Sequence, residues 1–353
     1  MSHSRRAFLS SVSLAVGSAG CVSITSESPN EWELDRERLR WRYETDGRVS
    51  ASPTLDDGSL YVGSHDGYFR SFDASTGTLN WEFGTDGEIW TDPIGEADAI
   101  YFGSRDRNLY SISTEGSERW RFETADGIFS NPAIEGDFVY FGSNDGRIYA
   151  IETSSGTKSW AYQTQSGVRS GPAIQDETMY VGNDEGSLHA LDINDGRLLW
   201  KYTTGGAISV DPVVKGDHLF FGSDDKKFYK LDQNGNRIWS QEVTTRLNSA
   251  PAVSGGIAYF GDLGGTFYAL DAETGEIRWT SDEPIGTINC DPTVVDGVVY
   301  VGDLRGYLHA FDAATGDHRW KYRTGNAVHS TPVVTDDTIY FGSNDGYLYA
   351  IER

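Results

Sequence analysis

Three aspartates of the chain stand directly before a proline: Asp92, Asp211 and Asp291. Carboxylates in such positions act as general bases or as oxygen ligands of calcium. Either role requires the three side chains to meet, and we expect them to lie too far apart for that, because they belong to separate repeats without insertions. Their expected role is therefore structural: a hydrogen bond from each carboxylate within the turn before its proline.

A second set of side chains, two residues earlier in each repeat, suits binding better than catalysis. It comprises Ser50, Trp90, Phe129, Arg169, Ser209, Asn248, Asn289 and His329. Aromatic, guanidinium, amide and imidazole groups together can orient a ligand or a peptide. The sequence contains no Ser-His-Asp ordering, no His cluster with metal spacing and no phosphate-binding glycine loop. We therefore predict a binding site without catalytic residues or a metal.

The segments that position these side chains are copies of one unit. The phrases DASTGTLNW (73–81), DAETGEIRW (271–279) and DAATGDHRW (312–320) are nearly identical. Tryptophans recur every 39 to 41 residues, at Trp41, Trp81, Trp120, Trp160, Trp200, Trp239, Trp279 and Trp320. A proline and a glycine repeat in the same register. The chain is therefore built from eight repeats of about 40 residues.

Each repeat reads as four short strands. Runs such as GSLYVGS (58–64) are aromatic and β-branched and end at glycine, and RIYAIE (147–152) follows a SNDG turn. The last strand alternates around its tryptophan, which places the aromatic side chains on one face and the charges on the other. Four strands per repeat of this length are typical of a β-propeller blade. The final repeat ends at Arg353 after its third strand, and an extra tryptophan strand begins near Leu39. We therefore predict an all-β, eight-bladed propeller of four-stranded antiparallel blades, closed by the N-terminal strand.

This repeat resembles the PQQ-like, or quinoprotein-type, propeller repeat. The resemblance rests on YVGSHDG (61–67), YFGSNDG (340–346) and the DA-x-TG-x₃-W phrases, and it covers residues 38–353. In the quinoprotein alcohol dehydrogenases, it implies PQQ in the central funnel with calcium, an adjacent-cysteine disulfide and a catalytic aspartate. This chain has only two cysteines, Cys21 and Cys290, and is about half as long as such enzymes. It is more similar to the BamB-like lipoprotein branch, which implies a cofactor-free binding scaffold.

Positions that agree between repeats are expected to be structural, and those that differ are expected to form the site. His189 and His309 occupy a slot that tyrosine fills in five other repeats, so we expect them to be packed strand residues. The turns beginning at His65, Arg105, Asp224 and Leu304 differ from repeat to repeat. We place these turns on the same face as the candidate binding residues.

The charge is strongly acidic, with 53 Asp and Glu against 29 Lys and Arg, a net of −24. Such a surface repels nucleic acid and anionic lipid, which excludes both as partners. The acids are spread over nearly every loop. This distribution favours a halophilic, high-salt surface over the alternative, a concentrated acidic binding face.

The first residues are predicted to be a targeting segment. Arg5 and Arg6 form a twin-arginine signal, and residues 18–21 resemble a lipobox with Cys21 as the lipidated residue. The apolar stretch between them is too short to span a membrane. The predicted domains are a signal peptide (1–20), an acidic tether (21–37) and the propeller (38–353).

These observations predict an exported monomer, anchored by its lipid to the outer face of the cytoplasmic membrane. Its expected function is that of a non-catalytic scaffold whose funnel face binds a protein or polymer. No cofactor is expected. The candidate funnel residues are Trp90, Phe129, Arg169, Asn248, Asn289, His329, Asp92, Asp211 and Asp291. The alternatives are an oxidoreductase that uses PQQ and calcium in the funnel, and a protein that binds or senses a small ligand.

Overall fold

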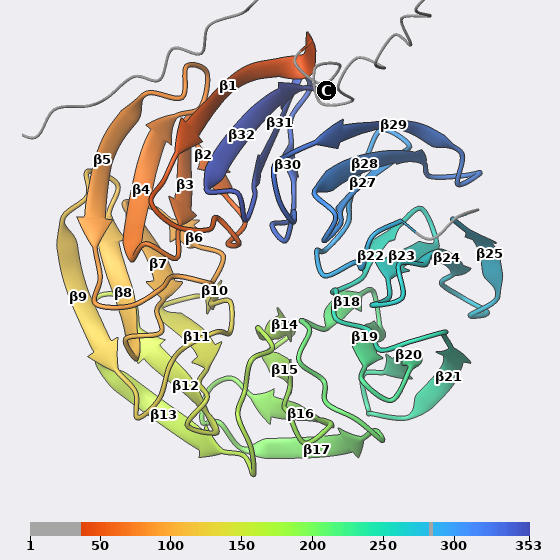
Figure 1. The fold of residues 1–353 in the computed structure, drawn as a ribbon. Coiled ribbons are helices and arrows are strands. Elements are labelled where there is room, and N and C mark those ends of the chain that lie inside the picture. The colour runs from red at the N-terminus through yellow and green to blue at the C-terminus, as the bar shows by residue number, and fades with distance from the viewer. Residues whose placement is uncertain (1–36, 282–284) are drawn as a thin grey trace, which may run out of the picture.

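The computed structural model describes residues 37–281 and 285–353. These residues form eight four-stranded antiparallel sheets around a central axis, as Figure 1 shows. The predicted eight-bladed propeller is thereby confirmed. The predicted signal, Cys21 and nearly all of the tether lie outside the described residues. Within the two described ranges, no helix has the length and apolar character needed to cross a membrane.

The first four blades follow one another in the first half of the described chain. Blade 1 consists of β2 (Thr54–Asp56), β3 (Ser59–Gly63), β4 (Tyr68–Asp73) and β5 (Leu79–Gly84). Blade 2 consists of β6 (Ile94–Glu96), β7 (Ala99–Gly103), β8 (Asn108–Ser113) and β9 (Glu118–Glu123). Blade 3 consists of β10 (Ala133–Glu135), β11 (Phe138–Gly142), β12 (Arg147–Glu152) and β13 (Lys158–Gln163). Blade 4 consists of β14 (Ala173–Gln175), β15 (Thr178–Gly182), β16 (Ser187–Asp192) and β17 (Leu198–Thr203).

The remaining blades complete the ring. Blade 5 consists of β18 (Val213–Lys215), β19 (His218–Ser223), β20 (Lys227–Asp232) and β21 (Arg237–Glu242). Blade 6 consists of β22 (Ala252–Ser254), β23 (Ile257–Gly261), β24 (Phe267–Asp271) and β25 (Ile277–Thr280). Blade 7 consists of β26 (Thr293–Val295), β27 (Val298–Gly302), β28 (Tyr307–Asp312) and β29 (His318–Arg323). Blade 8 consists of β30 (Val333–Val334), β31 (Thr338–Gly342), β32 (Tyr347–Glu352) and β1 (Leu39–Glu44).

The burial of each strand follows from its place in the blade. The third strand is covered on both faces by neighbouring blades, and four of the six residues of β12 are buried. Such strands must be apolar on both faces. The outer strand β13 alternates between half-buried and exposed residues around Trp160. Because only its inner face is covered, the charged side chains on the other face remain in water.

The hydrophobic core lies between blades. Tyr140, Ile148 and Ala150 of blade 3, for example, form one buried cluster with Met179 and Val181 of blade 4. Each blade therefore supplies half of two adjoining cores. Burial of this apolar area drives the packing of the blades against one another.

The repeated tryptophans fasten each blade to the next. The Trp160 indole Nε1 donates a hydrogen bond to the Ile193 carbonyl in the following blade, at 2.8 Å. The same ring lies against the turn glycine Gly196, whose φ is +71°. A β-carbon there would come within 2.5 Å of the ring. The repeated TG-x₃-W phrase is thus an inter-blade fastening.

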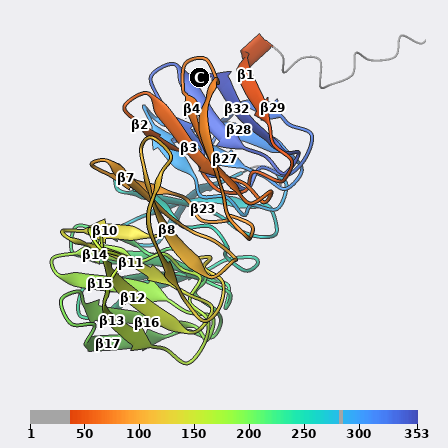
Figure 2. The ribbon, with the colours of Figure 1, turned by 90° about the vertical axis from the view of Figure 1, so that its left-hand side faces the viewer.

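The ring closes through β1, which pairs antiparallel with β32. Both views show these two strands side by side, with the C-terminus close by (Figure 1, Figure 2). At this seam, the Arg38 guanidinium covers the ring of Trp320 in blade 7, 4.4 Å from its centroid. This cation–π contact lies where the other seven repeat tryptophans contact a turn glycine.

Candidate functional site

A cavity of about 460 Å³ lies at the centre of the ring. It contains all nine of the predicted funnel residues. The lining side chains are Ser50, Ser52, Trp90, Asp92, Phe129, Asn131, Asn144, Arg169, Ser209, Val210, Asp211, Asn248, Asn289, Cys290, Asp291, His329 and Thr331. The repeats therefore bring their most variable positions to one place.

The backbone before each first strand aims these variable side chains inward. The residue before each of them is apolar and buried, as Ile89 before Trp90 and Val168 before Arg169 show. The Ile89 N–H donates to the Ser64 carbonyl, which ties the segment to the turn of the neighbouring strands. Since the preceding side chain is fixed in the core, the next one must point toward the channel.

One side of the cavity is aromatic and carries charge. Trp90 is 38% exposed and stacks on His65, with ring centroids 4.2 Å apart. It meets Phe129 edge to face at 6.0 Å. Arg105 covers Phe129 and forms an ion pair with Glu88 at 2.6 Å. The Trp90 indole hydrogen bond and the Arg105 ion pair lower the pKa of Glu88.

The opposite side is a row of amides joined by hydrogen bonds. Ser209 Oγ donates to Asn248 Oδ1 at 3.2 Å, and Asn248 donates in turn to Asn289. The Asn289 amide lies 3.0 Å from His329 Nδ1. Burial and the nearby Arg48 guanidinium lower the pKa of His329, so this ring is neutral at pH 7. The row therefore offers a fixed, uncharged pattern of donors and acceptors.

Arg169 separates these two sides. Its Nε lies 2.8 Å from Asp184 Oδ1 in the adjacent turn, and both side chains are partly exposed. A guanidinium held in this way keeps further N–H donors for a bound group. The cavity thus combines an aromatic platform, a cation and an amide row.

The four variable turns lie beside this site, as predicted. In each, the first residue's N–H donates to the backbone carbonyl two residues before a cavity-lining side chain. The bonds are His65 to Arg48, Arg105 to Glu88, Asp224 to Ala207 and Leu304 to Thr287. Asn144 and Asn344 occupy the same turn position in other blades, and Asn144 lines the cavity. Comparing that slot across all eight repeats would have identified both from the sequence.

A second ring of side chains lies deeper in the channel and joins neighbouring blades. Asp92 Oδ1 accepts from the Ser52 N–H at 2.5 Å. The same link joins Asp211 to Gly171 and Asp291 to Ala250. The expectation that each carboxylate bonds within its own turn was wrong. Each one instead accepts a hydrogen bond from the blade before it.

The three aspartates do not form a group that could hold a metal ion, as their expected separation implied, but two of them lie closer together than expected. The Asn131 amide nitrogen lies 3.5 Å from Asp92 Oδ2 and 3.0 Å from Asp211 Oδ2. Asp291 is close enough to interact electrostatically with both aspartates. The innermost segments approach the axis so closely that residues of well-separated blades become neighbours without any insertion.

Burial sets the charge of this deep ring. Desolvation raises the pKa of Asp291 to about 8 and that of Asp92 to about 7, and the Asp211 charge adds to both rises. Desolvation likewise raises the pKa of Asp211. Three carboxyl groups around one narrow channel resist simultaneous ionisation. Across residues 37–281 and 285–353, no group of three His, Cys, Asp or Glu side chains is arranged to hold a metal ion.

The two histidines in tyrosine slots are buried strand residues, as predicted. Each is 4% exposed. His309 Nε2 lies 3.1 Å from Asp303 Oδ2, which matches the bond from Tyr268 to Asp262 in blade 6. Burial lowers the pKa of His189 to about 4, so this ring is neutral.

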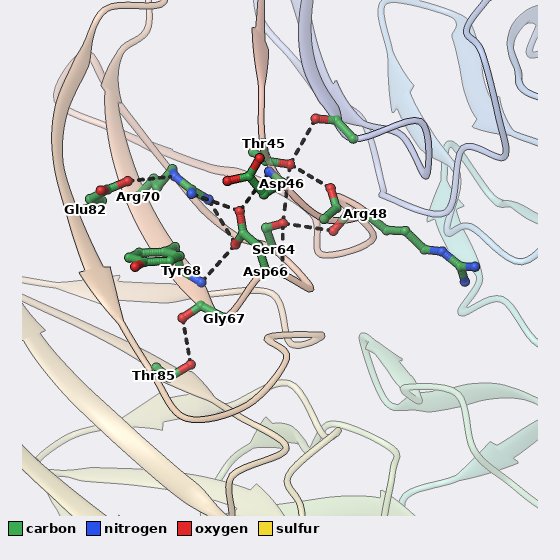
Figure 3. Close-up of polar contacts among 12 residues, drawn as sticks. Thr45, Asp46, Arg48, Ser64, Asp66, Gly67, Tyr68, Arg70, Glu82 and Thr85 are labelled. Atoms are coloured by element: carbon green, nitrogen blue, oxygen red, sulfur yellow. Dashed lines mark hydrogen bonds and ion pairs between the residues drawn. The ribbon is translucent and has the colours of Figure 1, made fainter. Parts of the chain in front are cut away.

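Sequence reasoning missed that buried cations also break the repeat. In blade 1, Arg70 fills the tyrosine slot and is 5% exposed. Its guanidinium pairs with Asp66 at 2.9 Å and with Glu82 at 3.2 Å, as Figure 3 shows. The Arg48 guanidinium points away from these contacts in the same view. A comparison of the same slot in all eight repeats would have revealed Arg70.

Comparisons with known proteins agree with this architecture. The family described as "Beta-alanine-activating enzyme, beta-propeller" matches residues 13–253, and the family described as "Outer membrane protein assembly factor BamB" matches residues 269–353. No curated protein matches the chain.

Solved structures share the fold at low sequence identity. BamB from Moraxella catarrhalis aligns with a TM-score of 0.79 at 21% identity, over 89% of this chain and 99% of that one. Quinohemoprotein alcohol dehydrogenase from Comamonas testosteroni aligns at 0.74 and 16%, over 89% of this chain and 76% of that one. Sqt1 from Saccharomyces cerevisiae aligns at 0.78 and 11%, over 90% and 99%.

Proposed function

Since the chain belongs to the β-propeller family of the beta-alanine-activating enzyme and is a PQQ-like propeller, we propose that it is a non-catalytic binding scaffold. Its partner is a protein or polymer segment that enters the central cavity. One observation carries the proposal: the frame repeats in all eight blades, whereas the side chains that line the cavity differ from blade to blade. A rigid ring whose central cavity is lined by side chains that differ from blade to blade is suited to recognition.

The chemistry of the cavity favours an extended segment with one aromatic or apolar anchor. Trp90 offers a partly exposed ring beside Phe129. The Asn248–Asn289 row on the other side offers amide groups to a backbone or to hydroxyl groups. Aromatic anchors supply much of the affinity at such sites, and polar groups around them supply the orientation.

Replacing Trp90 by alanine is expected to weaken partner binding about tenfold, since truncating a partly buried aromatic anchor costs about 1.4 kcal/mol or more. The mature protein would be used to capture partners from a detergent extract of its own membranes. Arg169→Ala should also reduce recovery. Ile238→Ala, at a 47% exposed position on outer strand β21, serves as the matched control. Equal recovery by the Trp90 and Ile238 variants would contradict the proposal.

The quinoprotein-type fold also suggests a second function, oxidation with PQQ and calcium in the channel. The residues do not fit this cofactor well. The channel wall carries Asp92, Asp211 and Asp291 with raised pKa values. Carboxyl groups that hold protons near neutral pH are poor ligands for the calcium ion that accompanies PQQ. Adding PQQ and calcium to the purified protein should give no visible absorbance shift and no dye-linked dehydrogenase activity, and clear activity would replace the scaffold by an enzyme.

We also propose that the protein is exported through its twin-arginine signal, Arg5 and Arg6, and anchored as a monomer by a lipid on Cys21. The support is the motif itself, with a lipobox-like sequence after a short apolar stretch. Cys21→Ser is expected to move the protein from the membrane fraction to the medium. Membrane and medium fractions would be compared by immunoblot, with Cys290→Ser as the cysteine control. Unchanged membrane retention of the Cys21 variant would refute the anchor.

A further inference from the structure

A second cavity of about 350 Å³ lies between blades 5 and 6, away from the central site. It is formed by the turn between β18 and β19 and by the residues that end β24. The β18–β19 turn follows the end of β18, whereas the segment that lines the channel precedes the start of β18. The second cavity and the channel therefore lie at opposite ends of this strand. Its charged side chains include Lys215, Lys230, Arg278, Asp271 and Glu273.

The floor of this groove holds a buried lysine. Lys230 is 1% exposed. The other seven blades carry alanine or serine in this slot: Ser71, Ser111, Ala150, Ala190, Ala269, Ala310 and Ala350. Taking an ammonium out of water costs several kcal/mol unless partners compensate. A small residue at this position is therefore sufficient for the fold, and the blade does not need a lysine there.

The partner of this lysine comes from the solvent side. Lys230 Nζ lies 2.8 Å from Glu273 Oε2, and the Glu273 side chain is 83% exposed. An ammonium has three donors, and among the described residues Glu273 is the acceptor that its side chain contacts. An exposed carboxylate can rotate into water at little cost. Glu273 therefore occupies a place that another anionic oxygen can take.

The rim adds further positive charge to a chain that is otherwise strongly acidic. Lys215 is exposed at the end of β18, and His218 lies beside it at the start of β19. Arg278 is oriented by an ion pair with Asp271 at 2.6 Å. A β-carbon placed on Gly255 or Gly256 would have no atom within 4 Å, so this side of the groove is open. Two of the seven lysines in the chain meet in this one groove.

We propose that the groove between blades 5 and 6 binds a small molecule bearing a phosphate or carboxylate group, with Lys230 at its floor and Lys215 and Arg278 at its rim. The anionic group displaces Glu273 from the Lys230 ammonium. Lysine acts as a point charge toward such groups, and arginine adds directional N–H donors. This site is independent of the proposed partner binding in the channel.

The test is titration of the mature protein with inorganic phosphate and, separately, with malonate, at fixed ionic strength, followed by amide chemical shifts or calorimetry. Saturable binding that Lys230→Ala weakens at least tenfold is expected. Alanine is native in this slot in five other blades, so the variant should fold. Glu273→Gln should tighten binding severalfold, because it removes the competing carboxylate. Stronger binding of one probe identifies the anionic group.

Several outcomes would overturn the proposal. One is that neither probe saturates at concentrations up to tens of millimolar. Another is that the Lys230 variant binds as tightly as the wild type. Weaker binding by Glu273→Gln would show that this carboxylate does not compete for the lysine, which would also refute the displacement. Trp90→Ala, which alters only the channel, serves as the matched control and should leave anion binding unchanged.

Discussion

Gly196→Ala is expected to lower the free energy of unfolding by about 3 kcal/mol. The φ of +71° strains any residue with a β-carbon, and that carbon would lie 2.5 Å from the Trp160 ring. The ring cannot retreat easily, because its Nε1 is bonded to the Ile193 carbonyl. In the variant, either the backbone at residue 196 must leave its native φ, or the Trp160 ring must move and weaken the contact between blades 3 and 4. Urea unfolding followed by tryptophan fluorescence would measure the loss.

Gly216→Ala is the matched control for this prediction. Its φ is +56°, and no atom lies within 4 Å of the added β-carbon. Only the backbone strain remains, so the expected loss is about 1 kcal/mol. Equal losses at the two positions would show that the indole does not fasten the blades through this turn.

Asp291→Asn is expected to stabilise the protein by about 3 kcal/mol at pH 9. The wild-type carboxyl, with its pKa raised to about 8 by burial and by Asp211 and Asp92, is ionised there at a cost. Asparagine removes that charge and keeps an oxygen to accept the Ala250 N–H. The figure is about half of what the pKa implies, because water in the channel screens the carboxylate. Asn131 already occupies the equivalent position in blade 3.

The size of this effect depends on pH. The ordinary pKa of the carboxyl is 3.8, so between about pH 4 and pH 8 the folded protein holds a proton that the unfolded chain releases. The stability that this group contributes is present below pH 4 and is lost as the pH rises through 8. The advantage of the variant should therefore vanish near pH 4 and be complete above pH 8.

Thermal unfolding at pH 4, 6 and 9 would measure this trend. Asp312→Asn is the control of opposite sign, since the Arg319 ion pair lowers the pKa of Asp312 to about 2 and the ionised form is the favoured one. That variant should lose stability at all three pH values. A gain by Asp291→Asn that does not change with pH would contradict the assignment of a raised pKa.

The architecture could be predicted almost completely because it repeats. Eight tryptophans in register, each at the same place in an alternating strand, define both the blade and its fastening. Ring closure followed from two fragments that together make one blade, and the pairing of β1 with β32 confirmed it. Local patterns sufficed because the contacts between blades repeat one arrangement, apart from the Arg38–Trp320 contact at the junction of blades 7 and 8.

The site could be predicted in part. Variation within a fixed slot selected Trp90, Arg169 and Asn289, and all of them line the central cavity. The spacing could not show that Asp92 and Asp211 meet at Asn131, because that depends on how closely the blades approach the axis. Packing across the ring sets this distance, and no periodicity within a repeat records it.

Buried cations were the other feature that the pattern did not reveal. Arg70 and Lys230 are buried at strand positions that are apolar or aromatic in most blades. The prediction rested on the residues that the repeats share, and these two residues are not shared. Their partners, Asp66 for Arg70 and Glu273 for Lys230, come from different parts of the blade structure. A systematic search for charges at buried slots would have found both.

The pairing of β1 with β32 also has a consequence for folding kinetics. It joins the two ends of the described chain, so it has the largest sequence separation of any ladder in the ring. The entropic cost of closing so long a loop grows only with the logarithm of its length. However, contacts between residues that are far apart in the sequence form slowly. Blades 1 to 7 can therefore assemble in sequence as the chain is made, and the last blade must wait for the C-terminus. Closure is then a single late event that packs blade 8 between blades 7 and 1 and covers the faces that both would otherwise expose.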